Sequence, residues 1–166
     1  MRSKLALFAL LALLIIFVGC IILLWGRASR SALLDAAEEG DLPKVQALLK
    51  GGRAIDERDS RIKFGWTPLI AAIYQGNTNV VHYLIASGAN VNLPDNSGET
   101  PLMWATARGD GGLDIVKDLI SHGADVNAKD GMGASVVSYA SSDPPKPMIL
   151  EIVKAAIAGQ EKKTNQ

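Results

Sequence analysis

The sequence has few of the residues from which disulfides and metal sites are built. Its 166 residues include one cysteine, Cys20, and two histidines, His82 and His122. Residues 31–166 contain no cysteine, which excludes a disulfide framework or a cysteine-based metal site there. Neither histidine has a second histidine, a cysteine or a suitably spaced carboxylate near it in the sequence. Both are therefore expected to be surface residues, and no metal or other cofactor is expected.

Signatures of catalysis are also missing. The nucleophile motif G-x-S-x-G, the phosphate-binding P-loop, the zinc motif H-E-x-x-H and the dinucleotide motif G-x-G-x-x-G do not occur. An enzyme needs a paired acid and base, or a nucleophile with its base. The sequence therefore predicts a protein that is not an enzyme and has no small-molecule substrate. An enzyme of unrecognised type is kept as an alternative.

Acidic residues are absent from the first 30 positions, which contain four basic residues. Of the 17 basic and 17 acidic residues in the chain, 13 basic and 17 acidic ones therefore fall in residues 31–166. Proteins that bind nucleic acid carry a basic surface. The mildly acidic balance of residues 31–166 argues against a nucleic-acid partner.

A long apolar segment is present at the N-terminus. Residues 5–25 contain no charge over 21 positions, with Arg2 and Lys4 before them and Arg27 and Arg30 after them. At about 1.5 Å per residue, a helix of this length spans a hydrocarbon core of about 30 Å. The pattern favours a signal anchor, or transmembrane helix, with a short linker in residues 1–30.

Two alternatives for this segment stay open. A cleaved signal peptide would have a shorter apolar region and a small-residue cleavage site. A lipoprotein would be acylated at Cys20, because Phe17 to Cys20 resembles a degenerate lipobox. The basic residues on both sides cancel under the positive-inside rule. Since leaders of this kind usually keep the N-terminus in the cytoplasm, we expect the rest of the chain to be periplasmic or otherwise extracytoplasmic.

The rest of the chain contains an internal repeat. Thr67-Pro68-Leu69 returns as Thr100-Pro101-Leu102, 33 residues later. Threonine is a good N-cap and proline suits the first helical position, so each triplet predicts the start of a helix. Gly76 and Gly109 end these helices. Each is followed by paired aliphatic residues and then by G-A-N-V-N or G-A-D-V-N, which begins at Gly88 and at Gly123 and ends a second helix.

These two copies resemble the ankyrin repeat in both helices and in the connecting loop. The resemblance implies an all-α ankyrin-repeat solenoid of about four helix-turn-helix repeats with β-hairpin-like loops, preceded by one transmembrane helix. The repeats are expected at residues 31–59, 60–95, 96–130 and 131–157, within a domain of residues 31–159 that is followed by a polar tail, 160–166. The chain resembles small, N-terminally anchored bacterial members of the family. It departs from the family pattern at Ile70 and Met103, where the family usually has histidine.

The resemblance implies that the protein binds another protein through the loop tips and the concave face formed by the first helices. Stacking predicts that Glu38, Gln75 and Arg108 lie in one row. The expected contact residues are Trp66, Tyr74, Gln75, Glu99, Trp104 and Arg108. The alternative for the two tryptophans is structural, with Trp104 packed on a neighbouring helix and Trp66 covering Phe64.

The favoured hypothesis is a membrane-anchored module for protein–protein interaction. An immunity-type inhibitor of an exported toxin is one alternative. A second is an accessory protein to an envelope enzyme, for example one active in oxidative stress.

Overall fold

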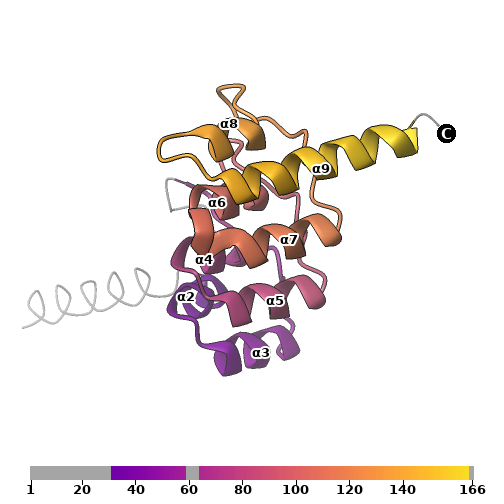
Figure 1. Ribbon diagram of the computed structural model, residues 1–166. Helices are drawn as coiled ribbons and strands as arrows, with labels where there is room; N and C mark the ends of the chain where they lie inside the picture. The colour runs from indigo at the N-terminus through magenta and orange to yellow at the C-terminus, as the bar shows by residue number, and fades with distance from the viewer. Residues whose placement is uncertain (1–30, 59–63, 165–166) are drawn as a thin grey trace, which may run out of the picture. The chain divides into compact units, whose positions relative to one another are not determined.

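Two layers of short helices make up the part of the chain that the structure describes, residues 31–58 and 64–164 of a computed structural model (Figure 1). The helices of these residues are α2 (Ala32–Glu39), α3 (Leu42–Lys50), α4 (Pro68–Gln75), α5 (Thr78–Ala86), α6 (Pro101–Ala107), the 3-10 helix η1 (Gly109–Gly112), α7 (Leu113–Ser121), α8 (Val136–Ser141) and α9 (Pro147–Thr164). The first layer is α2–α4–α6–α8 and the second is α3–α5–α7–α9, and each helix packs on the next in its own layer. The solenoid predicted from the repeat is confirmed.

The N-terminal predictions fall on residues that are not described. The apolar segment 5–25 and Cys20 both lie outside the described residues. Within residues 31–58 and 64–164, no helix combines the length and the hydropathy needed to cross a membrane.

A side-chain hydroxyl starts every helix of the first layer. It accepts a hydrogen bond from the backbone N–H three residues later, which satisfies one of the free donors at a helix start. The pairs are Ser31 with Leu34 (3.0 Å), Thr67 with Ile70 (3.2 Å), Thr100 with Met103 (3.4 Å) and Ser135 with Ser138 (3.4 Å). At Thr100 the backbone N–H also donates to Met103 Sδ, 3.4 Å away, so a sulfur stands where the family usually has histidine.

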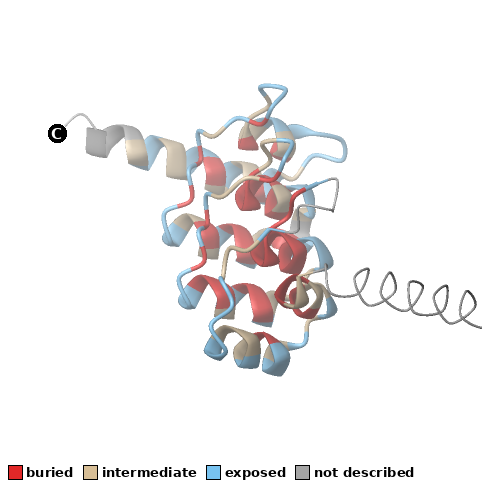
Figure 2. Ribbon diagram, turned by 180° about the vertical axis from the view of Figure 1, so that it is seen from behind, coloured by how far each residue is buried: buried red, intermediate tan, exposed pale blue. Residues whose placement is uncertain are grey.

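The core lies between the two layers, where the buried residues of every repeat face one another (Figure 2). Leu33, Leu69 and Leu102 hold the same position in three successive repeats, and each is at most 1% exposed. Burial of one such leucine contributes about 1.5–3 kcal/mol. The helices end at glycines, as predicted: Gly76, Gly88, Gly109 and Gly123 have φ angles of 81°, 90°, 65° and 85°.

Polar side chains join each repeat to the one before it. Asn77 Nδ2 donates to the carbonyl oxygens of Ala37 and Glu38, at 2.9 Å each. Arg108 donates in the same way to the carbonyl oxygen of Tyr74. The last carbonyl groups of a helix have no partner inside that helix. The ends of α2 and α4 are thus completed by the following repeat.

The loops between repeats also bond to one another. Asn96 N–H donates to the Phe64 carbonyl and Gly131 N–H to the Ser97 carbonyl, both at 2.8 Å. Gly98 has a φ of +82°, and a Cβ atom there would lie 2.7 Å from the nitrogen of Gly131. The loops are hairpin-like as expected, yet the described part of the chain contains no strand, only an isolated bridge between Lys129 and Ser135.

The C-terminal repeat differs from the others. Its first helix, α8, has six residues, whereas α9 has 18 and runs to Thr164. The expected polar tail, 160–166, therefore begins inside a helix. In the third repeat, the four-residue helix η1 lies between α6 and α7.

Candidate functional site

Four aromatic side chains gather on the first layer, from two successive repeats. Trp66, in the loop before α4, lies 4.7 Å from Tyr74 on α4 and 5.3 Å from Trp104 on α6, measured between ring centroids. Tyr74 and Trp104 are 5.7 Å apart, and Phe64 stacks on Trp66 at 5.6 Å. We call Phe64, Trp66, Tyr74 and Trp104 the ring cluster. Such separations are typical of favourable aromatic pairs.

The members of the ring cluster differ in how far they reach the solvent. Tyr74 and Phe64 are 47% and 45% exposed, Trp104 is half-buried, and Trp66 is only 8% exposed. The Trp66 indole N–H is buried and has no hydrogen-bond partner in the described residues. Both roles weighed for the tryptophans are therefore compatible with one geometry, since Trp66 covers Phe64 while supporting the exposed ring of Tyr74. Their part in binding a partner stays a prediction.

Two buried aspartates organise the loops beside the ring cluster. Asp95 Oδ1 accepts from the N–H groups of Ser97 and Glu99, at 2.8 and 2.9 Å. Its other oxygen accepts from the Trp104 indole N–H at 3.2 Å. The indole is thereby fixed in orientation, and the loop is joined to α6.

The same arrangement recurs one repeat later. Asp130 Oδ1 accepts from the N–H groups of Met132 and Ala134, at 2.9 and 2.8 Å. Its Oδ2 lies 2.9 Å from the Tyr139 hydroxyl, nine residues on, just as Trp104 follows Asp95 by nine. The hydrogen bond from Ala134 is the main cause that holds the pKa of Asp130 below its usual value of 3.8, with support from Tyr139 and Met132.

Tyr139 joins a second carboxylate to this arrangement. Its hydroxyl lies 2.5 Å from Glu99 Oε1 as well as 2.9 Å from Asp130 Oδ2. Burial, followed by the hydrogen bonds to Glu99 and Asp130, raises the pKa of the tyrosine. The phenol stays protonated and donates its single proton to one carboxylate at a time. We call Asp95, Glu99 and Asp130, with Trp104 and Tyr139, the carboxylate network.

The predicted row along the ends of the first-layer helices is present. Gln75 Nε2 donates to Glu38 Oε1 at 3.2 Å, and Arg108 contacts the backbone of Tyr74. Arg108 is thereby held at the C-terminus of α4, where a positive charge is favourable. Substitution of Arg108 is thus expected to affect stability as well as binding.

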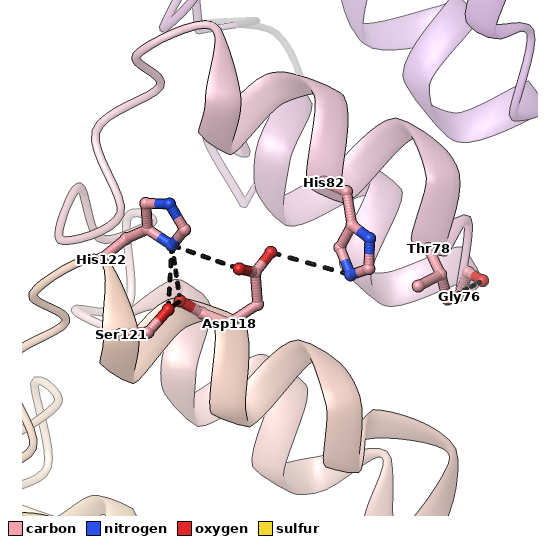
Figure 3. Close-up of polar contacts among 6 residues, drawn as sticks. All are labelled: Gly76, Thr78, His82, Asp118, Ser121 and His122. Atoms are coloured by element: carbon pink, nitrogen blue, oxygen red, sulfur yellow. Dashed lines mark hydrogen bonds and ion pairs between the residues drawn. The ribbon is translucent and has the colours of Figure 1, made fainter.

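Sequence reasoning found no carboxylate spaced to form a metal site with either histidine, but the fold brings one carboxylate close to both. His82 Nε2, on α5, lies 3.7 Å from Asp118 Oδ2, and His122 Nδ1, just after α7, lies 3.2 Å from Asp118 Oδ1 (Figure 3). Asp118 and His122 are one helical turn apart, and repeat stacking brings His82 alongside. All three are at least partly exposed, and pairs of this kind contribute little to stability.

This histidine group does not have the geometry of a catalytic triad. Ser121 Oγ, the Asp118 carbonyl and the Asp118 carboxylate all contact the same ring nitrogen, His122 Nδ1, at 3.1, 2.9 and 3.2 Å. A triad needs the nucleophile and the acid on opposite ring nitrogens. Among residues 31–58 and 64–164, no group of three or more histidine, cysteine or acidic side chains is placed to hold a metal ion.

Sequence reasoning singled out Trp104 and Glu99 but missed Asp95, Asp130 and Tyr139. The available signal was an aspartate followed nine residues later by an aromatic side chain, which occurs in two successive repeats. The pattern spans two successive junctions between repeats, and two copies of so short a pattern were too few to predict a structural role.

Comparisons with known proteins match these repeats. The family described as ankyrin repeats (3 copies) matches residues 33–130. Mouse ankyrin repeat and SAM domain-containing protein 6 is 43% identical over 68 residues, which are 41% of this chain and 8% of that protein. Mouse RelA-associated inhibitor is 42% identical over 78 residues, 47% of this chain and 9% of that protein.

Human protein phosphatase 1 regulatory subunit 27 is 37% identical over 71 residues, 43% of this chain and 44% of that protein. The chain thus spans less than half the length of these curated relatives. The match to the family extends over more than half of the chain and coincides with the stacked helices. The chain belongs to the ankyrin-repeat family.

Proposed function

We propose that this protein is an interaction module that binds another protein through the face formed by α2, α4, α6 and α8. Ankyrin repeats generally mediate protein–protein interaction. The observation that carries the proposal is the ring cluster, which leaves Tyr74 about half exposed on the first layer of helices. Tyrosine, tryptophan and arginine are the side chains that most often anchor interfaces.

The role of each predicted contact residue follows from its position. Tyr74 and Trp104 supply rigid apolar area, and the Trp66 ring packs against both of them. Gln75, which bonds to Glu38, and Glu99, which bonds to Tyr139, supply hydrogen-bonding groups. Because the rings are held by one another, little side-chain freedom is lost on binding, which favours affinity.

The test compares variants in affinity capture from cells that produce the protein. Tyr74→Ala is the test variant, and Lys154→Ala, on an exposed position of α9, is the matched control. A partner that is retained by the wild type and by the control, and lost by Tyr74→Ala, supports the proposal. Equal capture by all three would refute this face as the binding site. The urea unfolding midpoint of each variant shows whether the fold is intact.

We further propose that residues 5–25 anchor the module in a membrane, with the repeats outside the cytoplasm. The support is the charge-free length of this segment and the basic residues at both of its ends. A compartment-sensitive reporter fused after Gln166 tests the orientation. Activity outside the cytoplasm agrees with the proposal, whereas activity only inside contradicts it and places the partner in the cytoplasm.

A further inference from the structure

We propose that the loop of residues 130–134 binds a segment of a partner protein that donates one backbone N–H and buries one apolar side chain there. This surface shares no residue with the ring cluster, so the inference goes beyond the proposed function. We call residues 95–99 the inner loop and residues 130–134 the end loop. The end loop precedes α8, which is the last helix of the first layer in the described part of the chain (Figure 1).

The two loops have the same internal hydrogen bonds. In both, the N–H of the first aspartate donates to the carbonyl oxygen four residues later, at 3.0 Å. The carbonyl oxygen of that aspartate accepts from a glycine N–H three residues later, at 3.1 Å in the inner loop and 3.0 Å in the end loop. The two glycines, Gly98 and Gly133, have φ angles of +82° and +84°. Met132 therefore holds the place in the end loop that Ser97 holds in the inner loop.

The inner loop is covered by the end loop. Gly131 N–H donates to the Ser97 carbonyl oxygen at 2.8 Å, and a Cβ atom at Gly98 would lie only 2.7 Å from the Gly131 nitrogen. Tyr139, which follows the end loop, places its hydroxyl 2.5 Å from Glu99 Oε1. A loop of this type is thus completed by one backbone N–H and one side chain from the segment that covers it.

The preceding junction contains the same bond. Phe64 directly precedes the left-handed Gly65, as Ser97 precedes Gly98, and its carbonyl oxygen accepts from Asn96 N–H at 2.8 Å. Asn96 and Gly131 each follow the first aspartate of their loop directly. The series of acceptors is therefore Phe64, Ser97 and Met132, one in each successive loop.

Only the last acceptor of this series is open within residues 31–58 and 64–164. No N–H of the described residues donates to the Met132 carbonyl oxygen, and a Cβ atom at Gly133 would meet no atom within 4 Å. Met132 is 93% exposed, although its side chain is apolar. The end loop thus keeps the acceptor and the left-handed glycine of a junction, while the covering segment is not part of the described chain.

A hollow of about 310 Å³ lies beside the open acceptor and is lined by Asp130, Met132, Ala134, Ser138, Tyr139 and Ser142. Its polar side chains already have hydrogen-bond partners within the chain. Ala134 stands where the inner loop has Glu99, so the hollow lacks the carboxylate that meets Tyr139 at the inner loop. The volume is about twice that of a cavity of roughly 150 Å³ that binds benzene. An apolar ring or a branched aliphatic side chain therefore fits this hollow.

The covering segment is expected to come from a different protein. An extended segment presents a backbone N–H and a side chain side by side, as when a peptide strand adds to an exposed sheet edge. In a second copy of this chain, the N–H groups that serve this purpose, those of Asn96 and Gly131, already donate within their own chain. We call the Met132 carbonyl oxygen and the adjoining hollow the end-loop site.

The experiment selects random peptides, so the partner need not be identified first. A phage library of random twelve-residue peptides is depleted on Met132→Asp, which removes binders to other surfaces, and is then selected on the full wild-type chain in a non-ionic detergent. The selected peptides are synthesised with a dye, and fluorescence anisotropy gives their Kd. We expect them to share one aromatic or aliphatic residue, whose replacement by alanine raises the Kd about tenfold or more.

A second set of peptides tests the backbone bond. Each peptide bond is N-methylated in turn, which removes one N–H at a time. Methylation next to the shared apolar residue is expected to raise the Kd about three- to tenfold, because it removes the donor to the Met132 carbonyl oxygen.

Variants of the protein locate the site. Ala134→Glu narrows the hollow and adds a charge to it, and we expect the Kd to rise about tenfold or more. Met132→Asp changes a side chain that is almost fully exposed, so it tests the same site if Ala134→Glu lowers stability. Met148→Asp, at an exposed methionine on α9, is the matched control and should leave the Kd unchanged. The urea unfolding midpoint of each variant shows whether the fold is intact.

Three results would overturn the inference. The first is a library in which no binder survives depletion on Met132→Asp. The second is a set of peptides that bind Ala134→Glu as tightly as the wild type, or that tolerate N-methylation at every position. The third is a wild-type dimer in analytical ultracentrifugation that Met132→Asp abolishes, which would make a second copy the occupant of the site.

Tyr74→Ala separates this inference from the proposed function. It should leave the Kd of the selected peptides unchanged, because Tyr74 is not part of the end-loop site. Peptides that lose binding in Tyr74→Ala bind the ring cluster, which overturns this inference and leaves the proposed function standing. Equal capture of a partner by the wild type and by Tyr74→Ala would instead refute the proposed function and leave the end-loop site standing.

Discussion

The bonds from Asn77 to the preceding repeat offer the clearest test of how the repeats hold together. Asn77 Nδ2 donates to two carbonyl oxygens at the end of α2, at 2.9 Å each. Its side chain makes no cap bond to its own helix, α5, so substitution removes only the cross-repeat contact. Its backbone φ of −77° suits alanine. Each lost hydrogen bond costs about 0.5–1.5 kcal/mol, and we expect Asn77→Ala to destabilise the repeats by about 2 kcal/mol.

The measurement is urea unfolding of residues 31–166, followed by far-UV circular dichroism. Asn79→Ala is the matched control, because Asn79 is exposed on the same helix, and its effect should stay within about 0.5 kcal/mol. An unchanged dependence on urea is required before the shift of the midpoint is converted to a free energy. If Asn77→Ala and Asn79→Ala differ by less than about 0.5 kcal/mol, the cross-repeat bonds do not contribute as argued.

Two further predictions concern the loops. Gly98 and Gly133 have similar φ angles of +82° and +84°, but only at Gly98 would a Cβ meet backbone, 2.7 Å from Gly131 N. Gly133→Ala should lower the free energy of unfolding by about 1 kcal/mol, because alanine is strained in the left-handed conformation. Gly98→Ala should lower it clearly more, and urea unfolding measures both. Equal losses would mean that the close approach to Gly131 is relieved without penalty. Hydrogen bonds, chiefly from Ala134, hold the pKa of Asp130 in the folded protein below the unfolded value of 3.8. The ionised carboxylate therefore stabilises the fold above pH 3.8, and this contribution is lost as the pH falls through the lower folded pKa. Asp130→Asn should remove that part of the acid dependence from stability measured between about pH 2 and 6, and an unchanged profile would contradict it.

Local patterns were sufficient to predict the helices and their order. Thr67 and Thr100 cap their helices as their chemistry requires, and Ser31 takes the same place in a repeat that lacks the Thr-Pro pair. An N-cap hydroxyl accepts a hydrogen bond from the backbone N–H three residues later, and this bond depends only on the local sequence. The family resemblance then supplied the stacking.

The contacts between repeats could be predicted only in outline. Stacking placed Gln75 beside Glu38, but the contact between His82 and Asp118 needs the rotation of α5 against α7, and no single-repeat pattern contains that information. Trp104 stands out in the sequence, yet its bond to Asp95 depends on the curvature of the loop between them. Loop curvature follows from backbone angles that the side chains on either side specify only weakly.

The direction of the contacts between repeats has a consequence for synthesis on the ribosome. Asn77 completes the end of α2, and Arg108 completes the end of α4, so at these two helix ends the donor comes from the repeat that is made later. As the chain emerges, the ends of α2 and α4 lack these donors until Asn77 and Arg108 have been made. At these helix ends, loss of the third repeat would free the Tyr74 carbonyl group from Arg108, whereas loss of the first repeat would free the Asn77 amide from its two acceptors.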